Sequence, residues 1–305
     1  MATPVELHDG DRARATVYPE LGGWLTRYSR RLPGLGWVEG LHHDDAVVAR
    51  YPDRMWAGNP VLFPHVSFNV HDGKDGHYEL DGRVLASPQH GFARRVPWQV
   101  LRQSAGEVVM ELTDSERTRP SYPFAFRHEL AYRLVNGRLE WEQVIENRDR
   151  RPLPFSTGFH PYLPVPVRPG GERNRCFLRL PRGKRFNPLN RAEAFFDEPF
   201  PTQDFSVALD TNATVLLGDF AEREIALVDP TAGVEVAVNF ADHPAYRYAV
   251  LWSPGPEAPF YCIEPWTALP NSFGRPDGEI LVLRPGESFR ARLWMDVRPV
   301  GATTR

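Results

Sequence analysis

Three short stretches of the chain carry side chains that suit proton transfer, and each holds its side chain in a constrained setting. His90 is followed by Gly91, which allows the backbone to turn sharply and present the imidazole. His160 lies in a proline-rich stretch with aromatic neighbours, so its direction is expected to be fixed. Glu264 ends the apolar run Phe260-Tyr261-Cys262-Ile263, where an unpaired carboxylate is costly. We therefore expect Glu264 either to have a chemical role or to pair with an interior arginine.

One carboxylate and two imidazoles provide a general base and a general acid. With ordinary pKa values of about 4.3 for glutamate and about 6.5 for histidine, Glu264 would be ionised and a histidine partly protonated at neutral pH. This set of groups fits a sugar isomerisation, a hydrolysis or a polar binding pocket equally well. The residue types alone leave these three alternatives open.

Sequence motifs for a metal or a cofactor are weak or absent. The run His42-His43-Asp44-Asp45 has ligand types, but adjacent side chains of an extended segment point apart. The glycines at 34, 36 and 40 have the wrong spacing for a dinucleotide fingerprint, and no strand and helix surround them. We predict no metal and no cofactor.

The elements that must position these residues are strands, because apolar residues alternate along most of the chain. The strongest signal is a hairpin in which Asn136-Gly137 joins two alternating segments, 126–134 and 139–145. Similar patterns predict three further hairpins, each named by its two strands: 280–283 with 289–297, 224–228 with 234–238, and 98–102 with 107–112.

Consecutive hairpins predict an all-β fold, namely a large antiparallel β-sandwich that forms one domain over residues 1–305. The 30 prolines in 305 residues, about twice the average share, also exclude an all-helical protein. Irregular segments rich in proline, glycine and charge occur at about 40–60, 164–175 and 181–204. Such loops are where a rigid β scaffold usually carries its site.

Charge and cysteine content limit the classes of binding partner and the cellular compartment that we expect for this protein. The chain has 36 basic and 39 acidic residues, a net charge of −3, without the clustered positive charge of nucleic-acid or anionic-membrane binders. No apolar window is long enough for a membrane span, and the N-terminus lacks the pattern of a signal peptide. Cys176 and Cys262 are too few for a disulfide framework, so we expect reduced cysteines and a cytoplasmic protein.

The chain resembles the aldose 1-epimerase, or mutarotase, family in five stretches that follow the family's order over about residues 20 to 297. The matching stretches are Gly58-Asn59-Pro60-Val61-Leu62-Phe63-Pro64, His90-Gly91-Phe92-Ala93-Arg94, Tyr122-Pro123-Phe124, Gly158-Phe159-His160-Pro161-Tyr162 and Cys262-Ile263-Glu264-Pro265-Trp266-Thr267. The resemblance implies the family's galactose mutarotase-like supersandwich. It also implies interconversion of the α and β anomers of an aldohexose through the open-chain aldehyde.

By the same resemblance, Glu264 is the general base at the anomeric hydroxyl, and His160 is the general acid at the ring oxygen. His90 is expected to be a hydrogen-bonding partner near that oxygen. Asn59 belongs to a matching stretch and is an expected substrate contact. Trp266, with Trp56 and Trp252, could stack on the apolar face of a pyranose.

Two departures bear on the substrate. Phe68 stands where many family members have an arginine, and the family's substrate-binding aspartate has only Asp210 or Asp204 as candidates, of which Asp210 is preferred. Related hexose-6-phosphate epimerases hold phosphate with arginines, and Arg94 beside Arg95 would suit that substrate. The alternatives are therefore a hexose-6-phosphate 1-epimerase, a non-catalytic carbohydrate-binding protein, and a glycoside hydrolase or lyase with a second carboxylate. We expect a monomer or a homodimer.

Overall fold

The computed structural model describes residues 2–186, 199–200, 205–207, 214–274 and 279–301, and this part of the chain is nearly all β. The short helices named in this part of the chain are the α-helix α1 (Asp45–Ala49) and the 3-10 helices η1 (Pro19–Leu21), η2 (Ala93–Arg95) and η3 (Arg173–Arg175). No helix of the described segments is both long and apolar enough to span a bilayer. The predicted all-β class is confirmed.

The largest sheet is antiparallel and combines strands from both halves of the chain. Among the described residues it has nine strands, in the order β10 (Gln99–Gln103), β11 (Glu107–Thr113), β12 (Phe126–Val135), β13 (Arg138–Asn147), β27 (Ser288–Pro299), β23 (Val234–Asn239), β22 (Glu224–Asp229), β17 (Phe177–Arg179) and β20 (Phe205–Ser206). Its long central strands alternate buried and less buried residues, as expected for a sheet with one face on the core.

A second antiparallel sheet carries the residues of chemical interest. Its order in the described residues is β19 (Pro199–Phe200), β18 (Gly183–Phe186), β21 (Val215–Gly218), β24 (Tyr248–Trp252), β25 (Phe260–Trp266), β15 (Gly158–Phe159) and β5 (Val61–Leu62), and β16 (Tyr162–Pro164) also pairs with β25. Every residue of β25 is buried, which confirms the prediction that this strand is covered on both faces.

A third sheet and three small ribbons complete the fold. The third sheet has the order β1 (Val5–Asp9), β2 (Ala13–Tyr18), β3 (Trp24–Leu32) and β4 (Gly36–Glu39). The ribbons pair β6 (Val70–His71) with β7 (Lys74–Asp75), β8 (His77–Leu80) with β9 (Arg83–Ala86), and β14 (Leu153–Phe155) with β26 (Leu281–Leu283).

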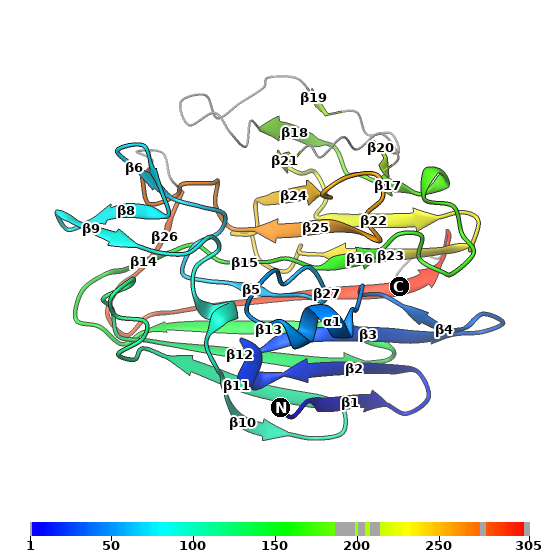
Figure 1. The fold of residues 1–305 in the computed structure, drawn as a ribbon, viewed down its shortest axis with the longest axis horizontal. Helices are drawn as coiled ribbons and strands as arrows, with labels where there is room; N and C mark the ends of the chain where they lie inside the picture. Colours follow the sequence, from blue (N-terminus) through cyan, green and yellow to red (C-terminus); the bar gives the residue numbers. More distant parts are fainter. Residues whose placement is uncertain (1, 187–198, 201–204, 208–213, 275–278, 302–305) are drawn as a thin grey trace.

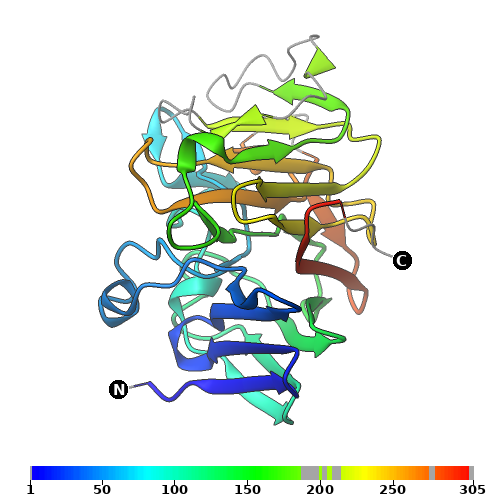
Figure 2. The same cartoon turned by 90° about the vertical axis from the view of Figure 1, so that its right-hand side faces the viewer.

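The three sheets share one hydrophobic core. One hydrophobic cluster contains Tyr28 of β3, Tyr132 of β12 and Ile263 of β25, so the same core joins all three sheets. Figures 1 and 2 show the sheet β1–β4 (blue) toward one end of the molecule and β24 and β25 (orange) nearer its middle. The architecture is the predicted large antiparallel sandwich.

Three of the four predicted hairpins are confirmed. Strands β12 and β13 pair up to Val135 opposite Arg138, and the loop residues Asn136 and Gly137 have φ angles of 53° and 83°. Two consecutive positive φ angles are what a type I′ turn requires. Strands β22 and β23 pair as expected, and so do β10 and β11, with a register shift between Val100 and Arg102.

The fourth predicted hairpin, between 280–283 and 289–297, is wrong. Its turn forms, because Glu287 N–H donates to the carbonyl of Arg284 (3.0 Å). The flanking strands nevertheless belong to different sheets, since β26 pairs with β14 and β27 pairs with β13 and β23.

Asn147, at the end of β13, provides the physical reason for this separation. Its main chain exchanges hydrogen bonds of 3.0 Å with Glu287 and Gly286, and its side-chain amide donates to the carbonyl of Leu283 (2.8 Å). These contacts take up the polar groups of the turn, so β26 leaves it toward β14 instead of folding back on β27.

Candidate active site

A pocket of about 400 Å³ opens beside β16, β24 and β25. These strands contribute Tyr162, Val250, Trp252, Glu264 and Trp266 to its lining. The other lining residues come from the segments 52–56, 67–68 and 89–95, together with His160, Thr214 and Pro270. The volume lies in the range of small-molecule sites, roughly 300–1,000 Å³. The predicted irregular segment 40–60 therefore contributes to this pocket.

Strand β25 aims Glu264 into the pocket by simple alternation. Ile263 packs in the main core, so its neighbour Glu264 points to the opposite face of the strand. The Glu264 side chain is 2% exposed, and its Oε2 atom has no hydrogen-bond partner among the described residues.

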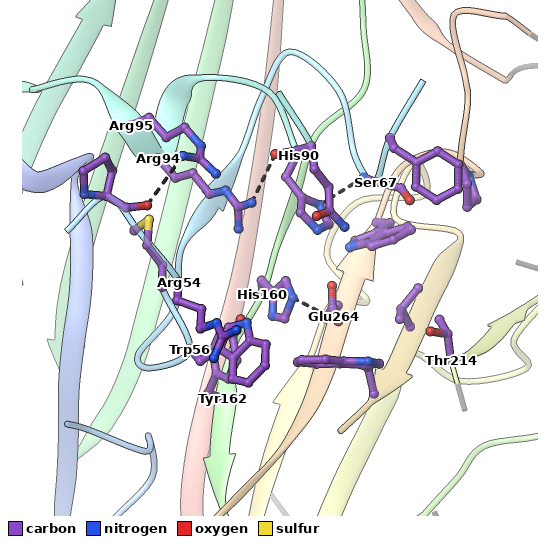
Figure 3. Close-up of a pocket in the computed structure, with 18 residues that line it drawn as sticks. Arg54, Trp56, Ser67, His90, Arg94, Arg95, His160, Tyr162, Thr214 and Glu264 are labelled. Carbon is purple, nitrogen blue, oxygen red and sulfur yellow. Dashed lines mark hydrogen bonds and ion pairs between the residues drawn. The ribbon is translucent and has the colours of Figure 1, made fainter. Parts of the chain in front are cut away.

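His160 meets this carboxylate directly. It follows β15, and its N–H donates to the carbonyl of Pro60 (3.1 Å), which holds the turn in place. Its Nε2 atom lies 3.3 Å from Oε1 of Glu264, and Figure 3 shows the two side chains facing each other. The imidazole stacks on the ring of Tyr162, with 4.6 Å between ring centroids and 9° between ring planes. The direction of His160 is thus fixed by contacts on its main chain and its ring.

His90 lies next to this pair, with 5.4 Å between its ring centroid and that of His160. Its Nδ1 atom accepts a hydrogen bond from the main-chain N–H of Ser67 (3.0 Å), drawn in Figure 3. The structure thus brings the three predicted catalytic candidates, His90, His160 and Glu264, into one buried cluster.

Aromatic rings and arginines form much of the remaining wall. The ring centroids of Trp266 and His90 are 5.8 Å apart. Trp56 packs edge to face against Trp252, with 5.6 Å between their ring centroids. Figure 3 places Arg54, Arg94 and Arg95 around the same space. The wall therefore combines flat apolar surface with positive charge.

Burial changes the proton affinities assumed from sequence. It raises the pKa of Glu264 well above the ordinary value, although the Arg94 guanidinium opposes this shift. It lowers the pKa of His160 well below the ordinary value, and here Arg94 acts in the same direction. The assumption of ordinary pKa values is therefore wrong, because a low-polarity site disfavours both charged forms.

Histidine and glutamate are residue types that bind metal ions. His90, His160 and Glu264 each offer one ligand atom, and these atoms lie within 4.8 Å of one another. Two features oppose a metal ion at this cluster. The Ser67 N–H occupies Nδ1 of His90, so the neutral ring carries its proton on Nε2, the nitrogen a metal would need. The buried guanidinium of Arg94 adds positive charge beside the cluster. The donor set does not fit a metal in this arrangement.

A family model described as Aldose 1-epimerase matches residues 42–296, which is most of the chain. The chain belongs to the aldose 1-epimerase family. The matched region contains the whole histidine and glutamate cluster, so the resemblance seen in the sequence motifs is confirmed.

This aldose 1-epimerase family member is distantly similar to several named proteins. It is 23% identical to the chromosomal LacX protein of Lactococcus lactis over 65% of this chain and 68% of that protein. It is 24% identical to the YphB protein of Escherichia coli, over 86% of this chain and 92% of that protein.

Solved structures show the same fold at similarly low identity. The Slr1438 protein of Synechocystis has a TM-score of 0.82 at 23% identity, covering 98% of this chain and 96% of that one. A galactose mutarotase related enzyme of Lactobacillus acidophilus has a TM-score of 0.79 at 21% identity, with 97% of both chains covered. The mutarotase-like fold of this family member is therefore established.

Only some of the predicted substrate contacts line the pocket. Arg94 and Trp266 line the pocket. Asn59 is fully buried outside the lining, its side-chain amide has no hydrogen-bond partner among the described residues, and its main chain bridges Leu25. Asp210, like Asp204, lies outside the described residues, so its predicted role stays a prediction. Phe68, at the family's arginine position, does line the pocket.

Sequence reasoning did not single out Ser67, Tyr162 or Arg54 as parts of the site. Tyr162 stands two residues after His160, but this spacing alone does not predict that the two rings stack. Arg54 falls in the segment 40–60, which was predicted to be a functional loop, yet nothing in its local sequence separates it from the chain's many other arginines. Ser67 contributes its main chain, which leaves no signal in the residue type.

Proposed function

We propose that this protein is an aldose 1-epimerase that interconverts the α and β anomers of an aldohexose through the open-chain aldehyde. The observation that carries the proposal is the contact of 3.3 Å between His160 Nε2 and Glu264 Oε1, buried in a pocket with tryptophan walls. Membership of the aldose 1-epimerase family supports a sugar substrate.

In the proposed reaction, the Glu264 carboxylate takes the proton of the anomeric hydroxyl while the bond between C1 and the ring oxygen breaks. The electron pair of that bond moves to the ring oxygen, which receives a proton from the His160 imidazolium. Rotation about the C1–C2 bond exposes the other face of the aldehyde. The same two proton transfers in reverse then close the ring as the opposite anomer.

This cycle needs a pair of groups that together hold one proton. A carboxylate beside an imidazolium and a carboxylic acid beside a neutral imidazole contain the same number of protons, and the contact between His160 and Glu264 allows exchange between these forms. Burial raises the proton affinity of Glu264 and weakens that of His160, which suits a base and an acid that must exchange roles.

The other proposed contacts orient the sugar. His90 donates a hydrogen bond near the ring oxygen, and Trp266 offers a flat surface to the pyranose. Asn59 and Asp210 remain proposed substrate contacts by family resemblance. A cytoplasmic location and a monomeric or homodimeric state likewise remain proposals.

Polarimetry on freshly dissolved α-glucose and α-galactose tests the function. The protein should accelerate the approach to equilibrium rotation, and Glu264→Gln and His160→Ala should each lower this acceleration by about 10² or more, because a proton-transfer group is lost. Circular dichroism of each variant controls for folding. No acceleration with any aldose or aldose phosphate would refute the proposal.

Two alternative functions can be distinguished from an epimerase. Sugar binding in calorimetry that Glu264→Gln leaves unchanged, without any acceleration, would indicate a non-catalytic carbohydrate-binding protein. A glycoside hydrolase requires a second carboxylate within about 5–10 Å of the first. Among the described residues that line the pocket, Glu264 is the only carboxylate, so this part of the chain does not favour hydrolysis.

A hexose-6-phosphate is the second candidate substrate, and the pocket arginines favour it. Arg94 is 8% exposed, its Nε atom has no hydrogen-bond partner among the described residues, and its Nη2 atom donates to the carbonyl of Gln89 (3.1 Å). None of Arg54, Arg94 and Arg95 forms an ion pair with a described carboxylate. A phosphate would supply the missing counter-charge.

Comparing α-glucose with α-glucose 6-phosphate separates the two substrates. If the phosphate is recognised, kcat/KM should be higher for the phosphorylated sugar, and Arg95→Gln should remove the difference while it leaves the free-sugar rate largely intact. Equal or faster turnover of the free sugar by the wild type would assign the neutral aldohexose.

A further inference from the structure

Two neighbouring side chains of β25 have polar atoms without partners in the pocket. Glu264 and Trp266 are two residues apart and both line the cavity, because alternate side chains of a strand share a face. Both are buried, at 2% and 3% exposure. Oε2 of Glu264 and Nε1 of Trp266 have no hydrogen-bond partner among the described residues. The first atom is an acceptor and the second a donor, and leaving either unsatisfied in a buried site costs free energy.

The donor and the acceptor lie near each other. Burial raises the pKa of Glu264, and the Arg94 guanidinium and the indole N–H of Trp266 oppose this rise. An N–H has that effect only when it is close to the carboxylate. The two atoms are thus neighbours that do not bond to each other. A hydroxyl group placed between them would satisfy both, because it accepts one hydrogen bond and donates another.

The indole ring of Trp266 has a fixed orientation. Its Cδ1 atom, which is bonded to Nε1, lies against Gly158, where a Cβ would come within 2.7 Å of it. The ring belongs to the same hydrophobic cluster as Leu62 and Val66, and its plane stands at 69° to that of His90. Packing therefore sets the direction of the N–H, as a preorganised donor requires.

The proposed reaction identifies the hydroxyl that belongs in this position. Oε1 of Glu264 contacts Nε2 of His160 (3.3 Å), so Oε2 is the oxygen left for the proton of the substrate. That proton comes from the anomeric hydroxyl. As the O1–H bond and the bond from C1 to the ring oxygen break, O1 becomes the carbonyl oxygen of the aldehyde. Partial negative charge gathers on O1 in the transition state, in ring opening and in ring closure, and a hydrogen-bond donor directed at O1 stabilises it.

We propose that Trp266 is a further catalytic residue, whose indole N–H donates a hydrogen bond to the anomeric oxygen while Oε2 of Glu264 takes the anomeric proton. This role uses the edge of the indole ring, whereas stacking on a pyranose uses its face. The inference rests on the proposed epimerase function, and its experiments separate a failure of the one from a failure of the other.

A tryptophan isostere tests the role of the N–H without changing the shape of the ring. Benzothienylalanine has sulfur in place of the indole N–H and can be introduced at position 266 alone. This variant should lose about 10²-fold or more in kcat, the usual effect of removing one such donor. The inhibition constant of 1,5-anhydroglucitol, which is glucose without O1, should stay near its wild-type value. Trp266→Phe, which keeps a flat ring and lacks the donor, should show a similar loss of kcat.

Trp141 provides the matched control. It is fully buried, and its Nε1 atom also has no hydrogen-bond partner among the described residues, but it does not line the pocket. Benzothienylalanine at position 141 should therefore leave kcat unchanged. Circular dichroism checks the folding of each variant.

Three kinetic results would count against the donor role. Wild-type kcat in the position 266 isostere, with an active wild type, would overturn this inference alone. Equal losses of kcat and of 1,5-anhydroglucitol affinity would assign Trp266 to the packing of the pocket wall and would also overturn it. A wild type without mutarotase activity would refute the proposed function and this inference with it.

NMR of protein labelled with ¹⁵N-tryptophan tests the contact directly. The indole signal of Trp266, assigned by its absence in Trp266→Phe, should shift when glucose is added and should shift much less with 1,5-anhydroglucitol. Galactose and its 1,5-anhydro derivative replace this pair if the wild type turns over galactose faster. Equal shifts with and without O1 would show that the N–H does not contact the anomeric oxygen and would overturn the inference.

Discussion

Individual residues of the site differ in what surrounds their polar atoms. Glu264 contacts His160 through one oxygen and leaves the other unbonded, whereas His90 has one nitrogen bonded to the main chain and the other facing the cavity. The three side chains are close together, yet their proton affinities are set by different partners. Burial is the largest influence on each, and Arg94 is the main nearby charge.

The pair of Glu264 and His160 predicts a bell-shaped dependence of kcat/KM on pH. At low pH the pair gains a second proton and loses its base, and at high pH it loses the shared proton and with it the acid. Because burial lowers the pKa of His160, the acid limb, at which the pair takes its second proton, should lie below the ordinary histidine value of about 6.5.

Polarimetric rates corrected for spontaneous mutarotation provide the measurement for this profile. The Glu264→Gln variant serves as the control, because its small residual rate should lack the acid limb. A wild-type profile that is flat between about pH 5 and 9 would contradict the titrating pair.

At the level of elements, the site depends on how closely β15 lies against β25. Gly158 pairs directly with Trp266, and a Cβ on Gly158 would lie 2.7 Å from Cδ1 of Trp266 and 2.8 Å from the carbonyl of Pro265. His160 and Glu264 each stand two residues from this contact. The distance between acid and base is thus tied to the absence of a side chain at position 158.

Gly158→Ala is therefore expected to push the two strands apart. Overpacking of this kind costs about 1–3 kcal/mol of unfolding free energy, and the displaced pair should lower kcat by at least tenfold, since misplacing catalytic groups by about 1 Å can cost 10²-fold. Denaturant unfolding and polarimetry measure the two effects.

Gly106→Ala is the matched control for that substitution. A Cβ at Gly106 would meet only the carbonyl oxygens of His8 and Leu134, at 3.6 and 3.7 Å, which are ordinary contacts. Its activity and stability should stay near those of the wild type. Wild-type kcat in Gly158→Ala would show that the strand spacing does not control the pair.

At the scale of the whole molecule, the core includes neutral polar groups that cannot accept charge. His128 is fully buried, with Nε2 3.0 Å from Oε1 of Gln143 and no partner for Nδ1 among the described residues. Burial lowers the pKa of His128 to about 3, and that of His65 to about 4. Both histidines are closely packed by aromatic rings, Phe63 and Trp98 in the case of His128.

Acid should consequently destabilise the fold well above the pH at which carboxylates titrate. Below about pH 6.5 His128 and His65 are protonated in the unfolded chain, whereas in the native protein they stay neutral down to their lowered pKa values. Their contribution to stability is therefore fully present above about pH 6.5 and decreases as the pH falls. Each such histidine contributes about 1.4 kcal/mol per pH unit until its native pKa is reached.

Denaturant unfolding at a series of pH values between about 7 and 4 tests this expectation. His128→Gln should reduce the slope of unfolding free energy against pH by about 1.4 kcal/mol per pH unit, which is the effect of one proton. An identical slope in His128→Gln and the wild type would show that His128 is protonated in the native state.

Local sequence patterns predicted much of this molecule. Alternation identified the all-β class, and the dipeptide Asn136-Gly137 identified its hairpin, because the two positive φ angles of such a turn are a local property. The apolar run before Glu264 predicted a strand covered on both faces, and the order of the motifs predicted the family. Each turn, strand and motif depends on residues close together in the chain.

Tertiary structure decided what depends on distant residues. The segments around 282 and 291 read as a hairpin, but Asn147 separates them, and no local pattern reveals a competing partner more than 130 positions away. The contact of His160 with Glu264 joins positions 104 apart, and the bond from Ser67 to His90 involves a main-chain N–H that every residue except proline possesses. Protonation depends on burial and neighbouring charge, and these exist only once the sheets have packed.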